Sequence, residues 1–138
     1  SRSRLYPDSL DTMGWRVGSS GLSLVLSANL PDLIDRYLCD DVTAFLGDHD
    51  LAVDDIAAWV SHPGGPKVIE AITSALDLGP DALELTWRSL AEVGNLSSSS
   101  VLHVLRDTIA KKPPAGRPGL LMAMGPGFCA EFVLLGWR

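Results

Sequence analysis

The sequence has few cysteines, few positive charges and no long apolar run, and each shortage excludes a class of protein. Two cysteines in 138 residues, Cys39 and Cys129, cannot form the disulfide framework of a small secreted domain, so we expect reduced thiols and a cytoplasmic protein. The formal net charge of −6 disfavours a nucleic-acid partner, because phosphate binding needs a basic surface. No apolar run approaches the ~20 residues that span a bilayer.

Several common site patterns are also missing. No Cys/His cluster has zinc spacing, no glycine-rich loop of the nucleotide-binding kind occurs, and no His-Asp pair accompanies the serines at 97–100 at a recognisable spacing. We therefore predict no metal site. A hydrophobic content of 46% predicts a globular domain with a core. The chain begins at Ser1 without Met, and we expect it to be part of a longer protein.

Apolar periodicity predicts an α/β domain with a mixed sheet. Two strands, 15–17 and 22–26, flank a turn, and a hairpin spans 120–124 and 128–135. A buried strand is predicted over 56–60. Helices are predicted over 30–46, with Asn29 as the cap and Gly47 as the end, over 66–76, over 85–93 and after the serines. In the last of these helices, five side chains are expected to face the core: Val101, Leu102, Leu105, Thr108 and Ile109.

Three segments carry the groups most suited to chemistry. His62 ends the predicted buried strand in Trp-Val-Ser-His-Pro-Gly-Gly-Pro at 59–66, Asn95 precedes the serines, and Gly-Pro-Gly at 125–127 joins two strands. An imidazole, a carboxamide and a bare turn are parts of a site that stabilises an enolate or oxyanion. Taken singly, each has a structural alternative: a loop histidine, a helix N-cap and a tight hairpin turn.

The other candidate side chains fit structural roles better. His49 lies in an acidic loop, and His103 lies off the apolar side of its predicted helix. Cys129 falls in a strand pattern, and Cys39 lies beside the apolar side of the helix predicted over 30–46, so we expect both thiols to be inert.

Taken together, His-Pro-Gly-Gly-Pro at 62–66, Gly-Asn-Leu-Ser-Ser at 94–98 and the 125–127 turn resemble the C-terminal half of a type III polyketide synthase, the chalcone and stilbene synthase family. The resemblance covers nearly the whole chain. Ketoacyl synthases of type III, which share the fold, usually carry His-Gln-Ala-Asn at the histidine. The details are similar to bacterial members, mycobacterial ones among them, that make long-chain alkylpyrones and alkylresorcinols.

The resemblance implies a thiolase fold, of which residues 1–138 form the C-terminal domain: a mixed β-sheet with helices on both faces. The family's catalytic triad is Cys-His-Asn, and His62 and Asn95 match two of its members. The nucleophilic cysteine belongs to the N-terminal half, and neither Cys39 nor Cys129 takes its place. The resemblance therefore implies that the isolated chain is inactive and that the full-length enzyme is a homodimer.

The implied activity is that of an acyltransferase in lipid biosynthesis. A starter acyl group from acyl-CoA is condensed with malonyl-CoA in a decarboxylative Claisen reaction that gives pyrone-type polyketides. Both thioesters are substrates, and no cofactor is implied. The imidazole of His62 and the amide of Asn95 would donate to the thioester oxygen while it becomes negative.

The resemblance also assigns a binding pocket. The family's Gly-Phe-Gly-Pro-Gly loop reads Ala-Met-Gly-Pro-Gly at 123–127, and a gatekeeping Phe of the plant enzymes falls on Leu24. Slimmer or more flexible side chains there predict a long aliphatic starter rather than an aromatic one. Gly64 to Lys67 would border the pantetheine arm. The expected substrate-binding residues are Leu24, Gly64, Gly65, Pro66, Lys67, Ser97, Met124, Gly125, Pro126, Gly127 and Phe128.

Two alternatives stay open at the level of sequence. The chain could belong to another condensing enzyme of the same fold, of the ketoacyl-ACP synthase III type. It could also be a catalytically inert folded fragment whose His62 and Asn95 are merely structural.

Overall fold

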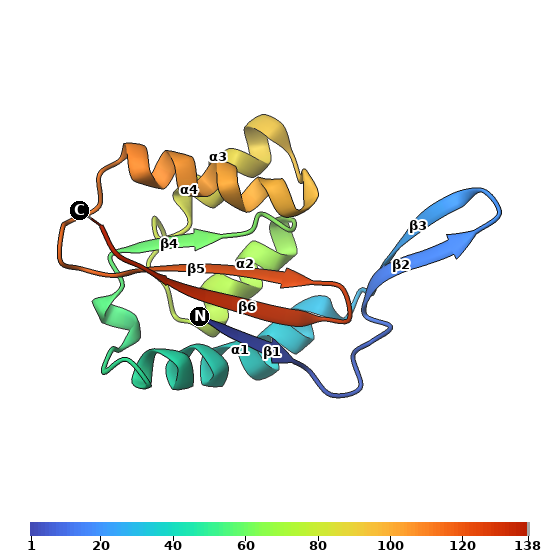
Figure 1. The fold of residues 1–138 in the computed structure, drawn as a ribbon, viewed down its shortest axis with the longest axis horizontal. Helices are drawn as coiled ribbons and strands as arrows, with labels where there is room; N and C mark the ends of the chain where they lie inside the picture. The colour runs from blue at the N-terminus through green and yellow to red at the C-terminus, as the bar shows by residue number, and fades with distance from the viewer. Residues whose placement is uncertain (138) are drawn as a thin grey trace.

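A four-stranded mixed sheet forms the centre of the computed structural model, which describes residues 1–137. The strands run in the order β1 (Arg2–Leu5), β6 (Cys129–Leu135), β5 (Gly119–Gly125) and β4 (Ala58–Ser61). β4 and β5 are parallel, and the other two pairs are antiparallel (Figure 1). The predicted mixed sheet is therefore confirmed, although β1 has no counterpart among the predicted strands.

Helices cover both faces of this sheet, as predicted. The helices α1 (Leu30–Gly47) and α2 (Pro66–Ala75) lie on one face, while α3 (Glu84–Val93) and α4 (Ser100–Ala110) lie on the other (Figure 1). Neighbouring residues of β4 divide between the two layers. Trp59 packs in the larger core with α1 and α2, and Val60 packs with α3 and α4, because successive strand side chains point to opposite faces.

The helix α1 shows how the apolar pattern becomes structure. Its buried side chains recur at three- and four-residue steps, at Leu30, Ile34, Leu38, Val42, Phe45 and Leu46, and so form one apolar side. Pro31 lies in the first turn, where a missing N–H costs nothing. Asn29 stands at the N-cap position without a side-chain cap bond. Gly47 is the last helical residue, as the sequence suggests.

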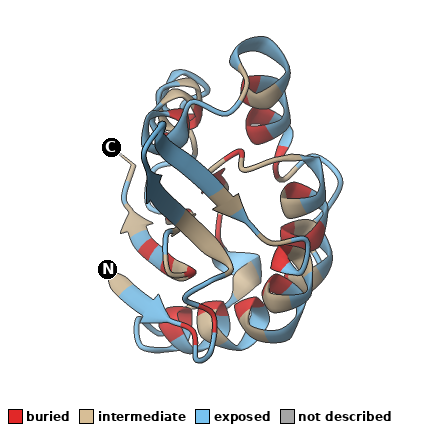
Figure 2. Cartoon of the chain, turned by 90° about the vertical axis from the view of Figure 1, so that its right-hand side faces the viewer, coloured by how far each residue is buried: buried red, intermediate tan, exposed pale blue. Residues whose placement is uncertain are grey.

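The strands β2 (Met13–Gly18) and β3 (Gly21–Leu26) form a separate hairpin that projects from the body (Figure 1). Its register pairs Met13 with Leu26, Trp15 with Leu24 and Val17 with Leu22 on one face. Most of the hairpin is exposed (Figure 2). The N–H of Gly127 donates to the carbonyl of Met13 at 2.7 Å, which ties the base of the hairpin to the β5–β6 turn.

Two shorter features adjust the predicted boundaries. A 3₁₀ turn over Val53–Asp55 precedes β4, so the strand begins at Ala58 rather than at residue 56. A second one, Ser97–Ser99, precedes α4. None of the helices described over 1–137 combines the length and the apolar character that crossing a bilayer requires.

Candidate active site

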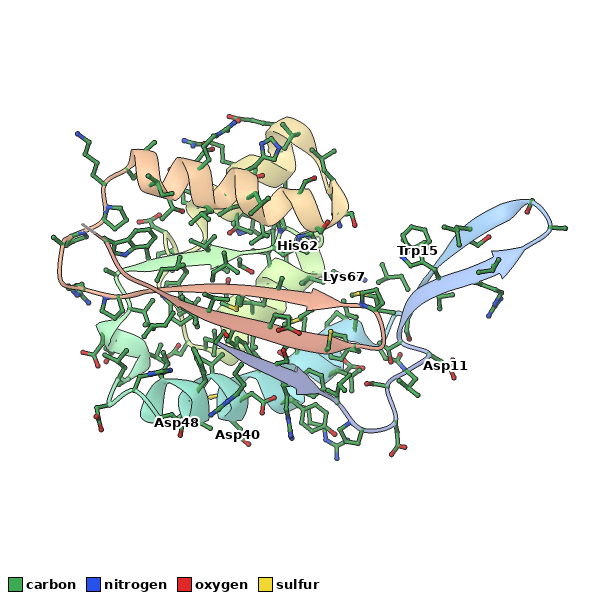
Figure 3. All side chains as sticks on the ribbon, viewed as in Figure 1. Asp11, Trp15, Asp40, Asp48, His62 and Lys67 are labelled. Carbon is green, nitrogen blue, oxygen red and sulfur yellow. The ribbon has the colours of Figure 1, made fainter. Side chains whose placement is uncertain are left out.

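His62 lies immediately beyond the end of β4, at the start of the loop into α2 (Figure 3). Its backbone N–H donates to the carbonyl of Met122 on β5 at 3.0 Å and so extends the parallel ladder by one bond. Its own carbonyl accepts from the N–H of Gly64 at 2.9 Å. Burial lowers the pKa of the imidazole below its ordinary value of 6.5, which favours the neutral ring. A neutral imidazole carries one N–H donor.

Asn95 follows α3 and is bonded directly to the His62 loop. Its Nδ2 donates to the carbonyl of Gly64 at 3.0 Å. Its Oδ1 accepts from the N–H of Ser97 at 2.9 Å, so part of the predicted capping role is present as a local turn. Because a carboxamide nitrogen has two hydrogens, one remains free for a ligand. The structure therefore brings the predicted imidazole and carboxamide together.

A cavity of about 620 Å³ lies between these two side chains and the projecting hairpin. Its walls come from four separated parts of the chain: the β2–β3 hairpin with the start of α1, the β4–α2 segment, the loop before α4 with the start of that helix, and the β5–β6 hairpin. Among the residues predicted from sequence, those that line it are Leu24, His62, Gly64, Asn95, Ser97, Met124, Gly125 and Pro126.

Five predicted substrate-binding residues do not line this cavity. Phe128 is completely buried in the main core, with its ring 5.1 Å from that of Tyr6, so the structure makes it a core residue rather than a pocket wall. Gly127 lies in the turn that bonds to Met13. The others are Gly65, the N-cap of α2, and the first two residues of that helix, Pro66 and Lys67, which are both exposed. Figure 3 labels Lys67.

The sequence did not predict most of the apolar residues that line the cavity. They include Met13, Trp15, Leu26, Leu30, Val68, Ile72, Val101 and Met122. The register of the β2–β3 hairpin could have predicted some of them. Trp15 pairs with Leu24, and Leu26 is two residues further along the same strand, so all three share one face. Glu131 is the one carboxylate among the described lining residues, and it accepts a hydrogen bond from Ser3.

Neither cysteine reaches the cavity. Cys39 is exposed on α1, and Cys129 is partly buried at the start of β6 with its Sγ 3.8 Å from the carbonyl of Pro126. Within residues 1–137, no three His, Cys, Asp or Glu side chains gather closely enough to hold a metal ion. The arrangement therefore places the His62 and Asn95 donors beside a largely apolar cavity, without a cysteine thiol among the described lining residues.

Comparison with known proteins agrees with this geometry. The profile of the family described as "Chalcone and stilbene synthases, C-terminal domain" matches residues 1–136. The chain is 53% identical over 138 residues to 1,3,6,8-tetrahydroxynaphthalene synthase of Streptomyces peucetius subsp. caesius, an alignment that covers 99% of this chain and 37% of that protein. It is 35% identical over 136 residues to the alpha-pyrone synthesis polyketide synthase-like Pks18 of Mycobacterium tuberculosis, covering 97% and 35%.

Solved structures show the same architecture. The crystal structure of 1,3,6,8-tetrahydroxynaphthalene synthase from Streptomyces coelicolor A3(2), a bacterial type III polyketide synthase, aligns with a TM-score of 0.92 at 28% identity, over 99% of this chain and 39% of that one. PKS-I from the brown alga Ectocarpus siliculosus aligns with a TM-score of 0.88 at 29% identity, over 99% and 38%. The predicted thiolase-like α/β fold is confirmed, and the chain spans a little over a third of the length of these relatives. The chain belongs to the chalcone and stilbene synthase family, as its C-terminal domain.

Proposed function

We propose that this chain is the C-terminal part of a type III polyketide synthase that condenses acyl-CoA with malonyl-CoA, and that His62 and Asn95 are its catalytic hydrogen-bond donors. One observation carries the proposal. The Asn95 amide is bonded to the His62 loop at Gly64, and both side chains line the same cavity.

The reaction demands stabilisation of a negative charge on oxygen. When malonyl-CoA loses carbon dioxide, the bond between the carboxylate carbon and the α-carbon breaks, and its electron pair forms an enolate on the thioester. The His62 N–H and the free Asn95 N–H would donate to that oxygen. One such fixed donor contributes about 3 kcal/mol of transition-state stabilisation. The enolate carbon then attacks the starter thioester, a carbon–carbon bond forms, and a thiolate leaves.

The apolar walls have a part in the same step, because water would protonate the enolate before it reacts. Buried side chains such as Leu30, Ile72 and Met122 line the cavity, and exclusion of water also strengthens hydrogen bonds inside a site. We place the nucleophilic cysteine in the part of the protein that precedes this chain. There it would approach His62, whose imidazole would favour the thiolate form.

Substitution of the two donors tests the proposal. In the full-length protein, we expect His62→Gln and Asn95→Ala each to lower kcat for condensation by ~10²–10³-fold. His103→Gln is the matched control, since this partly buried imidazole on α4 lies outside the cavity walls, and it should keep wild-type turnover. Wild-type kcat in both donor variants would refute the assigned roles.

The same assays separate the alternative functions. An inert fragment predicts that the full-length protein does not decarboxylate malonyl-CoA at all. A condensing enzyme of the ketoacyl-ACP synthase III type predicts a preference for malonyl-ACP over malonyl-CoA. Turnover of malonyl-CoA with repeated extension, followed by mass spectrometry of the products, is expected for a type III polyketide synthase.

The starter substrate has two candidates. On the cavity wall, Leu24 stands where the plant enzymes have a gatekeeping Phe, and Met124 stands where the family's loop has Phe. Both replacements support a long aliphatic starter and a pyrone-type product. The 53% identity to a protein named for tetrahydroxynaphthalene, a fused aromatic product without an alkyl chain, supports a starter without such a chain. A series of acyl-CoA starters of increasing length decides between them. Turnover that rises with chain length supports the first, and product formation from malonyl-CoA alone supports the second.

We further propose that the full-length protein is a cytoplasmic homodimer, in keeping with the family resemblance. Sedimentation velocity of the purified full-length protein would give the expected dimer mass, and a monomer would contradict this expectation.

A further inference from the structure

The peptide unit that leads into His62 is held at both of its polar ends. Its N–H, on His62, donates to Met122 as part of the sheet. Its carbonyl, on Ser61, accepts from the hydroxyl of Thr86 on α3 at 3.3 Å. Thr86 is 0% exposed and Ser61 is 1% exposed, so water does not compete for this bond. A side chain from the neighbouring layer thus fixes the backbone immediately before the imidazole.

The peptide unit that leaves Asn95 has a similar restraint. Its N–H, on Leu96, donates to the hydroxyl oxygen of Ser100 at 2.6 Å. Ser100 is 0% exposed at the start of α4. The next residue, Ser97, has a φ of +59°, a conformation that costs free energy for a non-glycine residue and persists only where its surroundings enforce it. Ser100 is therefore placed to hold a strained loop in register.

The direction of the Thr86 hydroxyl distinguishes it from other helical threonines of this chain. Thr73 and Thr108 each donate to the carbonyl four residues earlier in their own helix, Ile69 and Val104, at 2.9 and 2.8 Å. That local bond is the usual way to satisfy a buried helical hydroxyl. Thr86 instead bonds across to the strand that ends at His62, so its hydroxyl contributes to the position of the site as well as satisfying itself.

We propose that Thr86 and Ser100 are positioning residues, which hold the backbone beside His62 and Asn95 so that the two donors converge on one oxygen. This inference rests on the proposed function. Preorganised donors must keep their places within a fraction of an ångström, and a misplacement of ~1 Å costs ~10²-fold in rate. Neither hydroxyl belongs to a residue on the cavity wall, so each acts through its neighbour.

The test uses the full-length protein with paired variants. Thr86→Val and Ser100→Ala remove the two positioning hydroxyls. Thr108→Val and Ser89→Ala are the matched controls, because they remove buried hydroxyls on α4 and α3 that do not bond to the site backbone. Thr86→Ser keeps the hydroxyl and is the rescue variant. For each protein, kcat and KM for malonyl-CoA are measured together with Tm.

We expect Thr86→Val and Ser100→Ala to lower kcat by ~10–10²-fold with little change in KM, because they disturb the donors rather than the pocket. The control variants should keep wild-type kcat even where their Tm falls as far as that of Thr86→Val and Ser100→Ala. Thr86→Ser should recover most of the kcat that Thr86→Val loses. Wild-type kcat in Thr86→Val and Ser100→Ala, or losses matched by the controls, would overturn the inference. If His62→Gln and Asn95→Ala keep wild-type turnover as well, the proposed function itself fails.

Discussion

The state of one side chain, the His62 imidazole, decides what the site can do. Burial is the cause that lowers its pKa, because transfer of the imidazolium out of water is costly. The described structure shows no ion pair to this ring that would offset the cost. Glu131 also lines the cavity but is bonded by Ser3. In the proposed reaction, a neutral ring at neutral pH is therefore the form that would meet the substrate oxygen.

This lowered pKa gives a prediction with a definite sign. In an NMR titration of this chain, the His62 ring should change protonation with a midpoint below 6.5. Since the unfolded chain then binds more protons, stability should decline as the pH falls below 6.5 and level off below the folded-state pKa. His62→Gln should lack this contribution. A midpoint at or above 6.5 would contradict the desolvation of the ring.

Gly119 is packed too tightly to accept a side chain. A Cβ placed there would lie 2.4 Å from Cζ2 of Trp137 and 3.0 Å from the carbonyl oxygen of Ala58. We expect Gly119→Ala to destabilise the protein by roughly 1–3 kcal/mol, as overpacking does. Gly136→Ala, whose Cβ would meet nothing within 4 Å, is the control in thermal unfolding. Equal Tm values for the two variants would show that the contact is not tight.

At the scale of elements, most of the secondary structure could be predicted from local patterns. The helix α1 was predicted within one residue because its apolar side is regular over 18 residues. The strand β1 was missed, since its four residues show no alternation and it pairs only along one edge, with β6. The prediction of which α4 residues face inward was partly wrong. Leu102 is 58% exposed, whereas Val104 is fully buried, because the helix contacts the layer through a narrower side than its apolar residues suggest.

The turn between β5 and β6 requires a glycine at position 127 because of its backbone conformation. Gly127 has a φ of +76°, which a residue with a Cβ adopts only at a cost. Its N–H also anchors Met13 at the base of the β2–β3 hairpin. We expect Gly127→Ala to lower stability by about 1 kcal/mol and to loosen the hairpin. Thermal unfolding against Gly136→Ala, with hydrogen exchange of the Met13–Leu26 strand pair, measures both effects. Unchanged exchange there would contradict the anchoring role.

At the scale of the whole molecule, the site could be predicted only in part. His62 and Asn95 were singled out because three motifs taken together resemble the family pattern, whereas each residue alone had a structural alternative. The Asn95–Gly64 bond and the apolar walls depend on how four distant segments meet, and no local pattern contains that information. Phe128 shows the converse. Its place beside the Gly-Pro-Gly turn suggested a pocket wall, but its φ of +46° turns the side chain into the core beside Tyr6.

The apolar face of the β2–β3 hairpin is exposed to solvent. Trp15 is 55% exposed and Val17 80% exposed, although both belong to a face that continues into the cavity. Water at such a face opposes the proposed enolate chemistry. The hairpin side of the cavity is therefore open to water.

In the proposed reaction, a cysteine thiol outside this chain would carry the starter acyl group. Because neither Cys39 nor Cys129 lines the cavity, we expect the chain alone to form no acyl-enzyme from acyl-CoA and no condensation product. In the full-length protein, the double variant Cys39→Ser/Cys129→Ser should keep wild-type turnover and acyl-enzyme formation. Intact-protein mass spectrometry after acyl-CoA addition measures both. Acylation of the isolated chain at either cysteine, or loss of acylation in the double variant, would place the nucleophile within this chain and refute the proposed division of the triad.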